Sequence, residues 1–301
     1  MKPAPTSALP LERGVSLGRD AWRRLCRNRL ALVCLYAFGL ILAACMAGPW
    51  LSPYDPAVQD LALKAAPPSG EHWMGTDDLG RDVATRVLCG GRVSLAVGLA
   101  ATLVALVIGV VYGATAGYVG GKVDGVMMRL VDILYGVPFI IFIILVKVVV
   151  DEHIKDPTAS LVVIFLVIGA VEWLTMARIV RGQVLSLRKM EFVEAAESLG
   201  LGTWRIIRRH VIPNTVGPVI IYTTLTVPAV MLTEAALSFL GLGIKPPDSS
   251  WGVLIQEGAA KMETYPWMLV FPAVLFAVTL FCLNFIGDGL RNALDVRSAK
   301  D

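Results

Sequence analysis

Residues 93–121 read VSLAVGLAATLVALVIGVVYGATAGYVGG, a run of 29 residues without one charged side chain. Three further runs share this property: residues 30–50 (21 residues), 211–233 (23 residues) and 264–287 (24 residues). The hydrocarbon core of a bilayer is about 30 Å thick, and a helix needs roughly 20 apolar residues to cross it. Four stretches of this chain therefore qualify as membrane spans.

The composition agrees with a membrane protein. Of the 301 residues, 56% are hydrophobic and 17% are charged, and the mean hydropathy is +0.68. A disordered chain would be polar and rich in charge, and an ordinary soluble domain has about 25% charged residues. Two weaker candidate spans are residues 133–150, interrupted by Lys147, and residues 157–177, interrupted by Glu172. Buried or re-entrant segments are the alternative for these two. We predict an all-α membrane protein with six transmembrane helices in one polytopic domain.

The distribution of basic residues predicts the orientation. If the N-terminus is cytoplasmic, the inner segments hold 19 of the 27 lysines and arginines. This bias favours a topology with both termini inside. Arg81, Arg86 and Arg92 would then lie outside, where Asp77, Asp78 and Asp82 could pair with them.

The predicted domain limits follow from this topology. They are a cytoplasmic segment at residues 1–28 with an amphipathic or simply basic helix, a membrane domain at 29–295, and a cytoplasmic tail at 296–301. Within the membrane domain we predict outer loops at 51–92 and 241–265 and a cytoplasmic loop at 178–214.

Motifs for chemistry are missing from the sequence. The five cysteines show no CxxC spacing, the three histidines are scattered, and no GxxxxGK[ST] phosphate loop occurs. We therefore expect no metal, no cofactor, no catalytic residue and no ATP hydrolysis by this chain itself. Asp132, Glu172 and Glu234 lie in or beside spans. Each could line a substrate or proton pathway, or pair with a neighbouring base, and we favour pairing because an unpaired buried charge is costly.

Glycines repeat every four residues in the second span. Gly109, Gly113 and Gly117 fall on one helix face, where a neighbouring backbone can approach closely. We predict that this face packs against another helix.

The cytoplasmic loop is the most informative stretch. It reads ARIVRGQVLSLRKMEFVEAAESLGLGTWRIIRRHVIPN over residues 177–214. The pattern predicts a helix over 184–199, a turn at Gly200 and Gly202, and a second helix over 204–211 capped by Thr203. Pro213 would then mark the start of the next span. Apolar and small residues on the first helix favour contact with another protein.

This loop resembles the EAA motif of bacterial ABC-importer permeases. The resemblance is carried by Glu194, Ala195 and Ala196, then Gly200, then Pro213, with Ile212 where the family has leucine. Further blocks, HWMGTDDLGRDVATRVLCGGRVSL (72–95), GGKVDGVMMRLVDIL (120–134), LSFLGLG (237–243) and LNFIGDGLRNALDVR (283–297), resemble the C-type permease of oligopeptide and dipeptide importers, with the oligopeptide branch favoured. The resemblance covers about residues 23–295.

The resemblance implies a type I ABC-importer permease in the bacterial inner membrane. It implies a heterodimer with a second permease, two ATP-binding subunits that hold ATP and magnesium, and a periplasmic binding protein that delivers peptide. Glu194 would make a charged contact with an ATP-binding subunit, Ala195 and Ala196 would allow close docking, and Gly200 would permit the turn. We expect Pro246, Pro247 and Trp251 to face the binding protein.

Other readings remain open at this stage. The substrate could be a dipeptide, a nickel chelate, glutathione or an antimicrobial peptide. A secondary transporter or an intramembrane enzyme would belong to a different class. Both would leave the EAA loop unexplained, and the histidines lie in predicted loops, where an intramembrane active site would not place them.

Overall fold

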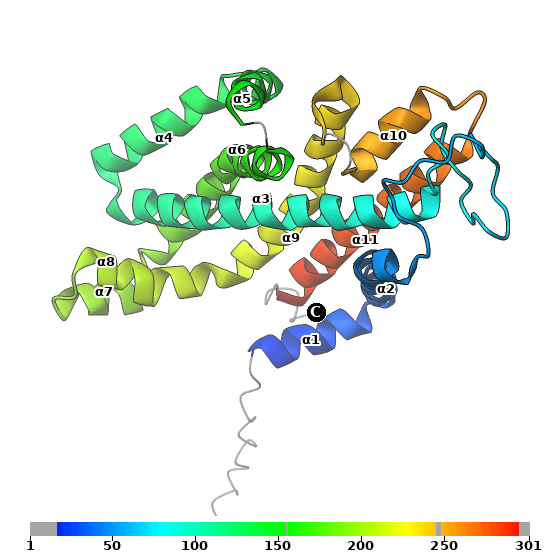
Figure 1. Cartoon of the computed structure of the whole chain (residues 1–301). Coiled ribbons are helices and arrows are strands. Elements are labelled where there is room, and N and C mark those ends of the chain that lie inside the picture. The colour runs from blue at the N-terminus through cyan, green and yellow to red at the C-terminus, as the bar shows by residue number, and fades with distance from the viewer. Residues whose placement is uncertain (1–16, 155, 245–247, 295–301) are drawn as a thin grey trace, which may run out of the picture.

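The computed structural model describes residues 17–154, 156–244 and 248–294. These residues form helices connected by loops, with no strand beyond an isolated bridge between Thr76 and Asp82 in this part of the chain. The helices are α1 (Leu17–Arg27), α2 (Arg29–Leu51), α3 (Val83–Val119), α4 (Gly121–Tyr135), α5 (Phe139–His153), α6 (Pro157–Leu187), α7 (Glu191–Ser198), α8 (Thr203–Ile206), α9 (Ile212–Leu237), α10 (Trp251–Ala259) and α11 (Trp267–Leu294). Two π-helical turns, Ile207–Val211 and Ser238–Leu242, flank α9 (Figure 1).

Four of the described helical segments are long and apolar enough to cross a membrane. They are Arg29–Leu51, Val83–Val119, Thr203–Leu242 and Trp267–Leu294, and each contains all or nearly all of one uncharged run of the sequence. The pair α4 and α5 raises the number to as many as five if it forms one broken span. The prediction of strongly apolar spans is thus confirmed, while the full number of six is not reached by length and composition.

The predicted span at residues 133–150 is wrong as a single straight helix. α4 ends at Tyr135, α5 begins at Phe139, and the two are bent by 80°. Pro138 explains the break, because proline has no backbone N–H and disfavours helical geometry at the preceding residue, Val137. The predicted span at 157–177 forms the first part of α6, which continues to Leu187.

α3 is the central helix of the molecule. At 1.5 Å per residue its 37 residues extend over about 55 Å. This is longer than a hydrocarbon core of about 30 Å, so both ends of α3 can protrude from the membrane. Figure 1 shows α7 and α8 near the C-terminal end of α3, and α10 with the segment 52–82 near its N-terminal end. We call these the inner end and the outer end, following the predicted topology.

Glycines let α6 pack directly along α3. A Cβ atom added at Gly109 would lie 2.5 Å from the Met176 side chain, and one at Gly113 would lie 2.4 Å from the backbone oxygen of Ala177. At Gly117 the nearest atom would be the backbone oxygen of Arg181, at 2.9 Å. Real side chains do not tolerate such distances, so the three glycines permit backbone contact between the two helices.

The segment 203–242 is continuous, unlike the prediction of a separate cytoplasmic helix. α8 passes through the first π-helical turn directly into α9. Pro213 lies at the start of α9, and its missing N–H and its ring would disturb a regular α-turn. The wider π-turn just before it absorbs this disturbance without ending the helix.

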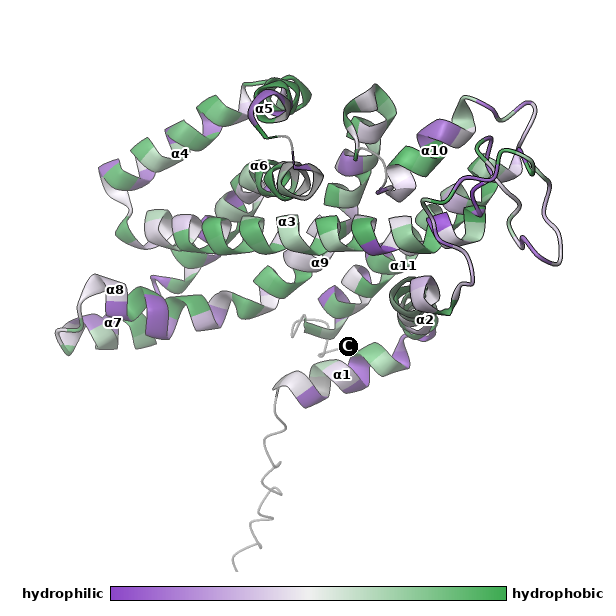
Figure 2. Ribbon diagram, in the orientation of Figure 1, coloured by the Kyte–Doolittle hydropathy of each residue, from purple (hydrophilic) through white to green (hydrophobic). Residues whose placement is uncertain are grey.

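Large apolar side chains remain exposed on the long helices. On α2, for example, Tyr36 and Leu40 are each 72% exposed, and Figure 2 shows that α2, α3 and α5 consist mostly of hydrophobic residues. Such surfaces need lipid or another protein beside them.

Candidate functional site

The helix α7 presents two different faces. Val193 and Ala196 are 0% and 3% exposed and pack into a cluster with Tyr118 of α3, Val184 of α6 and Ile207. Glu194 and Ala195 are exposed. The EAA triplet is therefore divided between the surface and the core. The prediction that Ala196 takes part in docking is wrong, because this residue anchors α7 to the rest of the chain.

The turn after α7 is a Schellman motif. Gly200 has a φ of +75°. The amide of Gly200 donates to the backbone oxygen of Glu197 at 2.9 Å, and the amide of Leu201 donates to the backbone oxygen of Ala196 at 3.2 Å. This pair of bonds defines the motif, and its left-handed residue is usually glycine. The predicted helix over 184–199 is instead two helices, since α6 ends at Leu187 and α7 begins at Glu191. Gly202, rather than Thr203, is the N-cap of α8.

A basic cavity lies beside α7. Trp204, Arg205, Arg208 and Arg209 line a volume of about 480 Å³. No ion pair joins these arginines to another side chain in the part of the chain that the structure describes. Trp204 is 56% exposed, and Leu199, on the neighbouring turn, is 81% exposed. The inner end therefore carries acidic, basic and apolar side chains for which the described residues supply no partner.

Two ion pairs attach α4 to α6. Arg178 donates to Asp132 at 2.7 Å, and Arg181 donates to both oxygens of Asp124 at 2.5 and 2.6 Å. Asp132 is thus paired, as predicted. Glu234 is not paired with a base: it is 4% exposed, and its Oε1 accepts hydrogen bonds from Ser238 and Ser250. No partner for Glu172 is recorded among the described residues.

A buried ion network holds the outer end together. The Asp77 side chain is 1% exposed and accepts from Arg81 Nε at 2.6 Å and from Arg86 Nη1 at 2.7 Å. Arg86 also donates to Glu257 of α10 at 2.8 Å. The backbone amides of Leu79 and Arg81 donate to the second oxygen of Asp77. The predicted pairing of the loop's basic and acidic residues is confirmed for Arg81 and Arg86, whereas Arg92 lies over the Trp50 ring.

A weaker pair lies on the surface of the same region. Burial of Asp78 would raise the pKa of its carboxyl, but the ammonium group of Lys261 beside it more than offsets this effect, and the pKa lies below the usual value. The two side chains are 42% and 34% exposed, so solvent screens their attraction.

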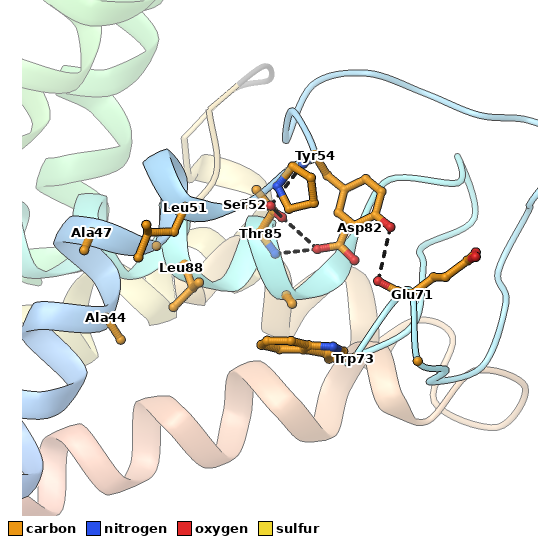
Figure 3. A pocket seen from close by; sticks show the side chains of 14 residues that line it. Ala44, Ala47, Leu51, Ser52, Tyr54, Glu71, Trp73, Asp82, Thr85 and Leu88 are labelled. Carbon is orange, nitrogen blue, oxygen red and sulfur yellow. Dashed lines mark hydrogen bonds between the residues drawn. The ribbon is translucent and has the colours of Figure 1, made fainter.

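Asp82 caps the outer start of α3 and borders a second cavity. One oxygen accepts from the amide and the hydroxyl of Thr85, both at 2.7 Å, and the other lies 2.9 Å from His72 Nδ1. The cavity, of about 560 Å³, lies between α2, the segment 52–73 and α3 (Figure 3). Its wall is mostly apolar, with Ala44, Ala47, Leu51, Leu88 and Trp73 opposite the polar end at Ser52, Tyr54, Glu71 and Asp82. Asp82, Ser52 and the Tyr54 hydroxyl are already hydrogen-bonded within the chain.

The prediction that Trp251 contacts a partner on the outer face is wrong. Trp251 is 0% exposed, its Nε1 donates to the Val87 oxygen at 2.9 Å, and its ring packs edge-on against Phe276. It is a core residue that fixes α10 to α3. Pro246 and Pro247 lie outside the described residues.

Among the described residues, no group of three or more His, Cys, Asp or Glu side chains is arranged to hold a metal ion. Tyr118, Glu197 and Glu257 were not predicted as site residues. Their contacts join residues at least 79 positions apart, and no local pattern signals such pairs.

Two family models match the chain. The family described as "Binding-protein-dependent transport system inner membrane component" matches residues 84–300. The family described as "N-terminal TM domain of oligopeptide transport permease C" matches residues 16–68. Together they cover α7 and the three glycines Gly109, Gly113 and Gly117 of α3, which we call the glycine stripe, while residues 69–83 lie between the two matches.

Permease proteins of several transport systems are similar to this chain. The "Oligopeptide transport system permease protein OppC" of Escherichia coli (strain K12) is 50% identical over 284 residues, which is 94% of this chain and 92% of that protein. The "Dipeptide transport system permease protein DppC" of Bacillus subtilis (strain 168) is 44% identical over 93% of this chain and 86% of that protein. Among solved structures, a chain of the MetNI methionine ABC transporter in inward-facing conformations aligns with a TM-score of 0.52 and 18% identity, covering 69% of this chain and 96% of that chain.

Proposed function

Because this chain belongs to the family of binding-protein-dependent transport system inner membrane components, we propose that it works as one of two permease subunits in an ATP-driven importer. It is a multi-pass protein of the bacterial inner membrane and a peptide-import permease of the oligopeptide type. It is not itself an enzyme, since separate subunits hydrolyse ATP in such transporters.

The observation that carries the proposed mechanism is the arrangement of α7. This helix exposes Glu194 and Ala195 at the inner end of the molecule while Val193 and Ala196 fix it to α3 and α6. A short helix so held can receive a push from a partner and pass it to the spans. In the mechanism we propose, an ATP-binding subunit contacts Glu194 through a basic side chain, since a charge-assisted hydrogen bond gives both strength and orientation.

The partners in this proposal are a second permease, two ATP-binding subunits and a periplasmic peptide-binding protein. Support comes from surfaces for which the described residues supply no partner: the apolar faces of α2 and α3 and the arginines of the cavity at α8. ATP and magnesium would be bound by the ATP-binding subunits, and this chain would contribute movement and a wall of the peptide pathway.

The proposed topology has six spans with both termini in the cytoplasm. It counts α6 and the broken pair α4–α5 as spans in addition to the four that pass on length and composition. Support comes from the excess of basic residues in the predicted inner segments.

Import would proceed by alternating access of the whole complex. Closure of the ATP-binding subunits would move α7 and turn the pathway towards the binding protein, and peptide would then enter between the two permeases. No bond of the peptide is made or broken in this step.

Substitution of Glu194 tests the proposal. We expect Glu194→Lys to insert normally and to abolish peptide uptake, because it places a like charge against the basic partner group. Glu152→Lys is a matched control, since Glu152 is an exposed carboxylate on the last turn of α5, far along the sequence from the motif. Uptake at the wild-type rate with Glu194→Lys would contradict the proposed contact.

Affinity purification provides a second test. The tagged chain in mild detergent should bring with it one further permease and ATP-binding subunits, identified by mass spectrometry. A stable, folded chain that purifies alone would contradict the proposed assembly.

A further inference from the structure

One hydrogen bond joins α7 to the inner end of α3. The hydroxyl of Tyr118 donates to Glu197 Oε1 at 2.8 Å, across 79 residues of sequence. Tyr118 is 5% exposed and lies in the last turn of α3. Its acceptor is a carboxylate, and hydrogen bonds to ionised groups are stronger and more directional than neutral ones.

The other attachment of α7 to the rest of the chain is apolar packing, which is less directional than a hydrogen bond. An isolated helix of eight residues is unstable in water, so α7 depends on its contacts with the rest of the chain. Val193 and Ala196 supply apolar packing, which has no direction of its own. Glu197 is one turn after Val193, at the edge of the buried face, whereas Ala195 lies on the opposite face. A bond at this edge therefore sets which way Glu194 and Ala195 point.

Arg188 strengthens the same junction. Its guanidinium lies 5.9 Å from the centre of the Tyr118 ring, and its Nη1 donates to the oxygen of Val119 at 3.4 Å. Arg188 lies in the linker between α6 and α7, so the ring of Tyr118 contacts the linker while its hydroxyl binds α7. The end of α3 thus contacts both α7 and the linker that precedes it.

The rest of α3 is suited to transmit a displacement. α6 packs against α3 through the glycine stripe. The outer end of α3 is fixed by the Asp82 cap and by the hydrogen bond from Arg86 to Glu257 of α10. A movement of α7 that is carried into Tyr118 would therefore act on a continuous helix that ends at α10. Without the Tyr118 bond, α7 could turn or slide on its apolar face and lose the displacement.

We infer that Tyr118 and Glu197 are positioning residues for energy coupling, which hold α7 in the orientation that transmits movement of the ATP-binding subunits to α3. This inference rests on the proposed function and adds to it the hydrogen bond that connects α7 to α3. Neither residue needs to touch the ATP-binding subunit or the peptide.

The test measures peptide imported per ATP hydrolysed by the assembled transporter in membrane vesicles with its binding protein. Tyr118→Phe removes the hydroxyl and keeps the ring. We expect the ratio to fall about tenfold, the factor that corresponds to ~1.4 kcal/mol, which is just below the usual range for a hydrogen bond to a charged group. Tyr112→Phe is the matched control, because the Tyr112 hydroxyl donates to the backbone of Met127 in α4 instead of α7, and should keep the wild-type ratio.

Variants of Glu197 separate positioning from general stability. Glu197→Gln keeps an oxygen acceptor and should retain most of the coupling, whereas Glu197→Ala should match Tyr118→Phe. The double variant of Tyr118→Phe and Glu197→Ala should be no worse than either single variant, because both remove the same bond.

The outcomes are distinct. A wild-type ratio in Tyr118→Phe, additive losses in the double variant, or equal losses of uptake and hydrolysis through failed assembly would each overturn the inference. If the wild-type transporter itself shows no ATP-dependent peptide uptake, the proposed function fails instead.

Discussion

The two ends of α3 differ in how the polar side chains around them are paired. At the outer end, Asp77 is buried and receives two guanidinium groups and two backbone amides, all from this chain. At the inner end, Glu194, Arg208 and Leu199 are exposed, and one side-chain hydrogen bond, between Tyr118 and Glu197, joins α7 to α3. The polar groups of the outer end are paired with one another, while the inner end exposes groups for which the described residues supply no partner.

The groups that stabilise the fold lie at the outer end of α3, and the groups that we expect to contact a partner lie at the inner end. A buried ion network whose members are all satisfied makes a region rigid, and loss of one member leaves a buried charge unpaired. Exposed groups contribute little to stability, so they can be selected for contact with another subunit. Four changes should sharpen or break this contrast.

Loss of Asp77 should have the largest effect on stability. Asp77→Ala leaves the buried Arg81 without its close acceptor and leaves Arg86 with Glu257 alone. Removal of one partner from a buried pair costs roughly 3–5 kcal/mol. We expect a large fall in the thermal unfolding temperature of the full chain in mild detergent. Asp78→Ala, which removes only the exposed pair with Lys261, should cost about 0–1 kcal/mol. Equal losses in the two variants would show that the outer network is not a buried anchor.

Alanine in the glycine stripe should have the next largest effect. In Gly113→Ala the new Cβ would meet the backbone oxygen of Ala177 at 2.4 Å, and such overpacking costs about 1–3 kcal/mol. Gly182→Ala on α6 meets nothing within 4 Å and should stabilise that helix by about 0.5–1 kcal/mol. Shifts of opposite sign in the unfolding temperature are therefore predicted, and a stabilising Gly113→Ala would contradict the close packing of α3 and α6.

Gly200→Ala should have a smaller and local effect. A non-glycine residue in the left-handed region costs about 1–2 kcal/mol, and Gly200 has a φ of +75°. Gly202 has a φ of −68°, so Gly202→Ala is the matched control without this strain. We expect faster amide hydrogen exchange in α7 for Gly200→Ala alone, with peptide uptake reduced and exchange at α10 unchanged. Unchanged exchange in α7 would mean that the turn after it does not hold the helix.

Leu199→Ser should change stability least. Leu199 is 81% exposed, and surface substitutions usually stay within about ±0.5 kcal/mol. The same change should weaken binding of the ATP-binding subunits, because it removes an apolar contact beside Glu194. Leu51→Ser is the control at the outer end, where Leu51 is 80% exposed. If Leu51→Ser weakens binding as much as Leu199→Ser does, the inner end is not the docking surface.

The sequence predicts the parts of this structure that follow from local patterns. The uncharged runs fix four spans, the glycine spacing identifies the face of α3 that meets α6, and Gly200 marks the turn. The break at Pro138 and the passage of α8 into α9 were not predicted, because proline is compatible both with a helix end and with a helix that widens into a π-turn. The choice depends on tertiary packing.

The candidate site shows a similar limit. Glu194 and Ala195 are exposed, whereas Ala196 is buried and Trp251 is a core residue. Burial depends on which helix covers a residue, and that information is distributed over distant segments. The ion network at Asp77 was foreseen only as local pairing, since Glu257 reaches it from α10. The hydrogen bond between Tyr118 and Glu197 has no local signal at all.

Site-directed labelling of Ala195 tests the central claim most directly. Ala195→Cys, in a chain whose native cysteines are replaced, would be treated with a membrane-impermeant maleimide in inside-out vesicles and in intact cells. Met262→Cys serves as the matched position near the outer end, since Met262 is 55% exposed. The account predicts labelling of Ala195→Cys only in inside-out vesicles and its protection by bound ATP-binding subunits, with the opposite sidedness and no protection for Met262→Cys. Labelling of Ala195→Cys in intact cells, or equal labelling with and without the ATP-binding subunits, would contradict it.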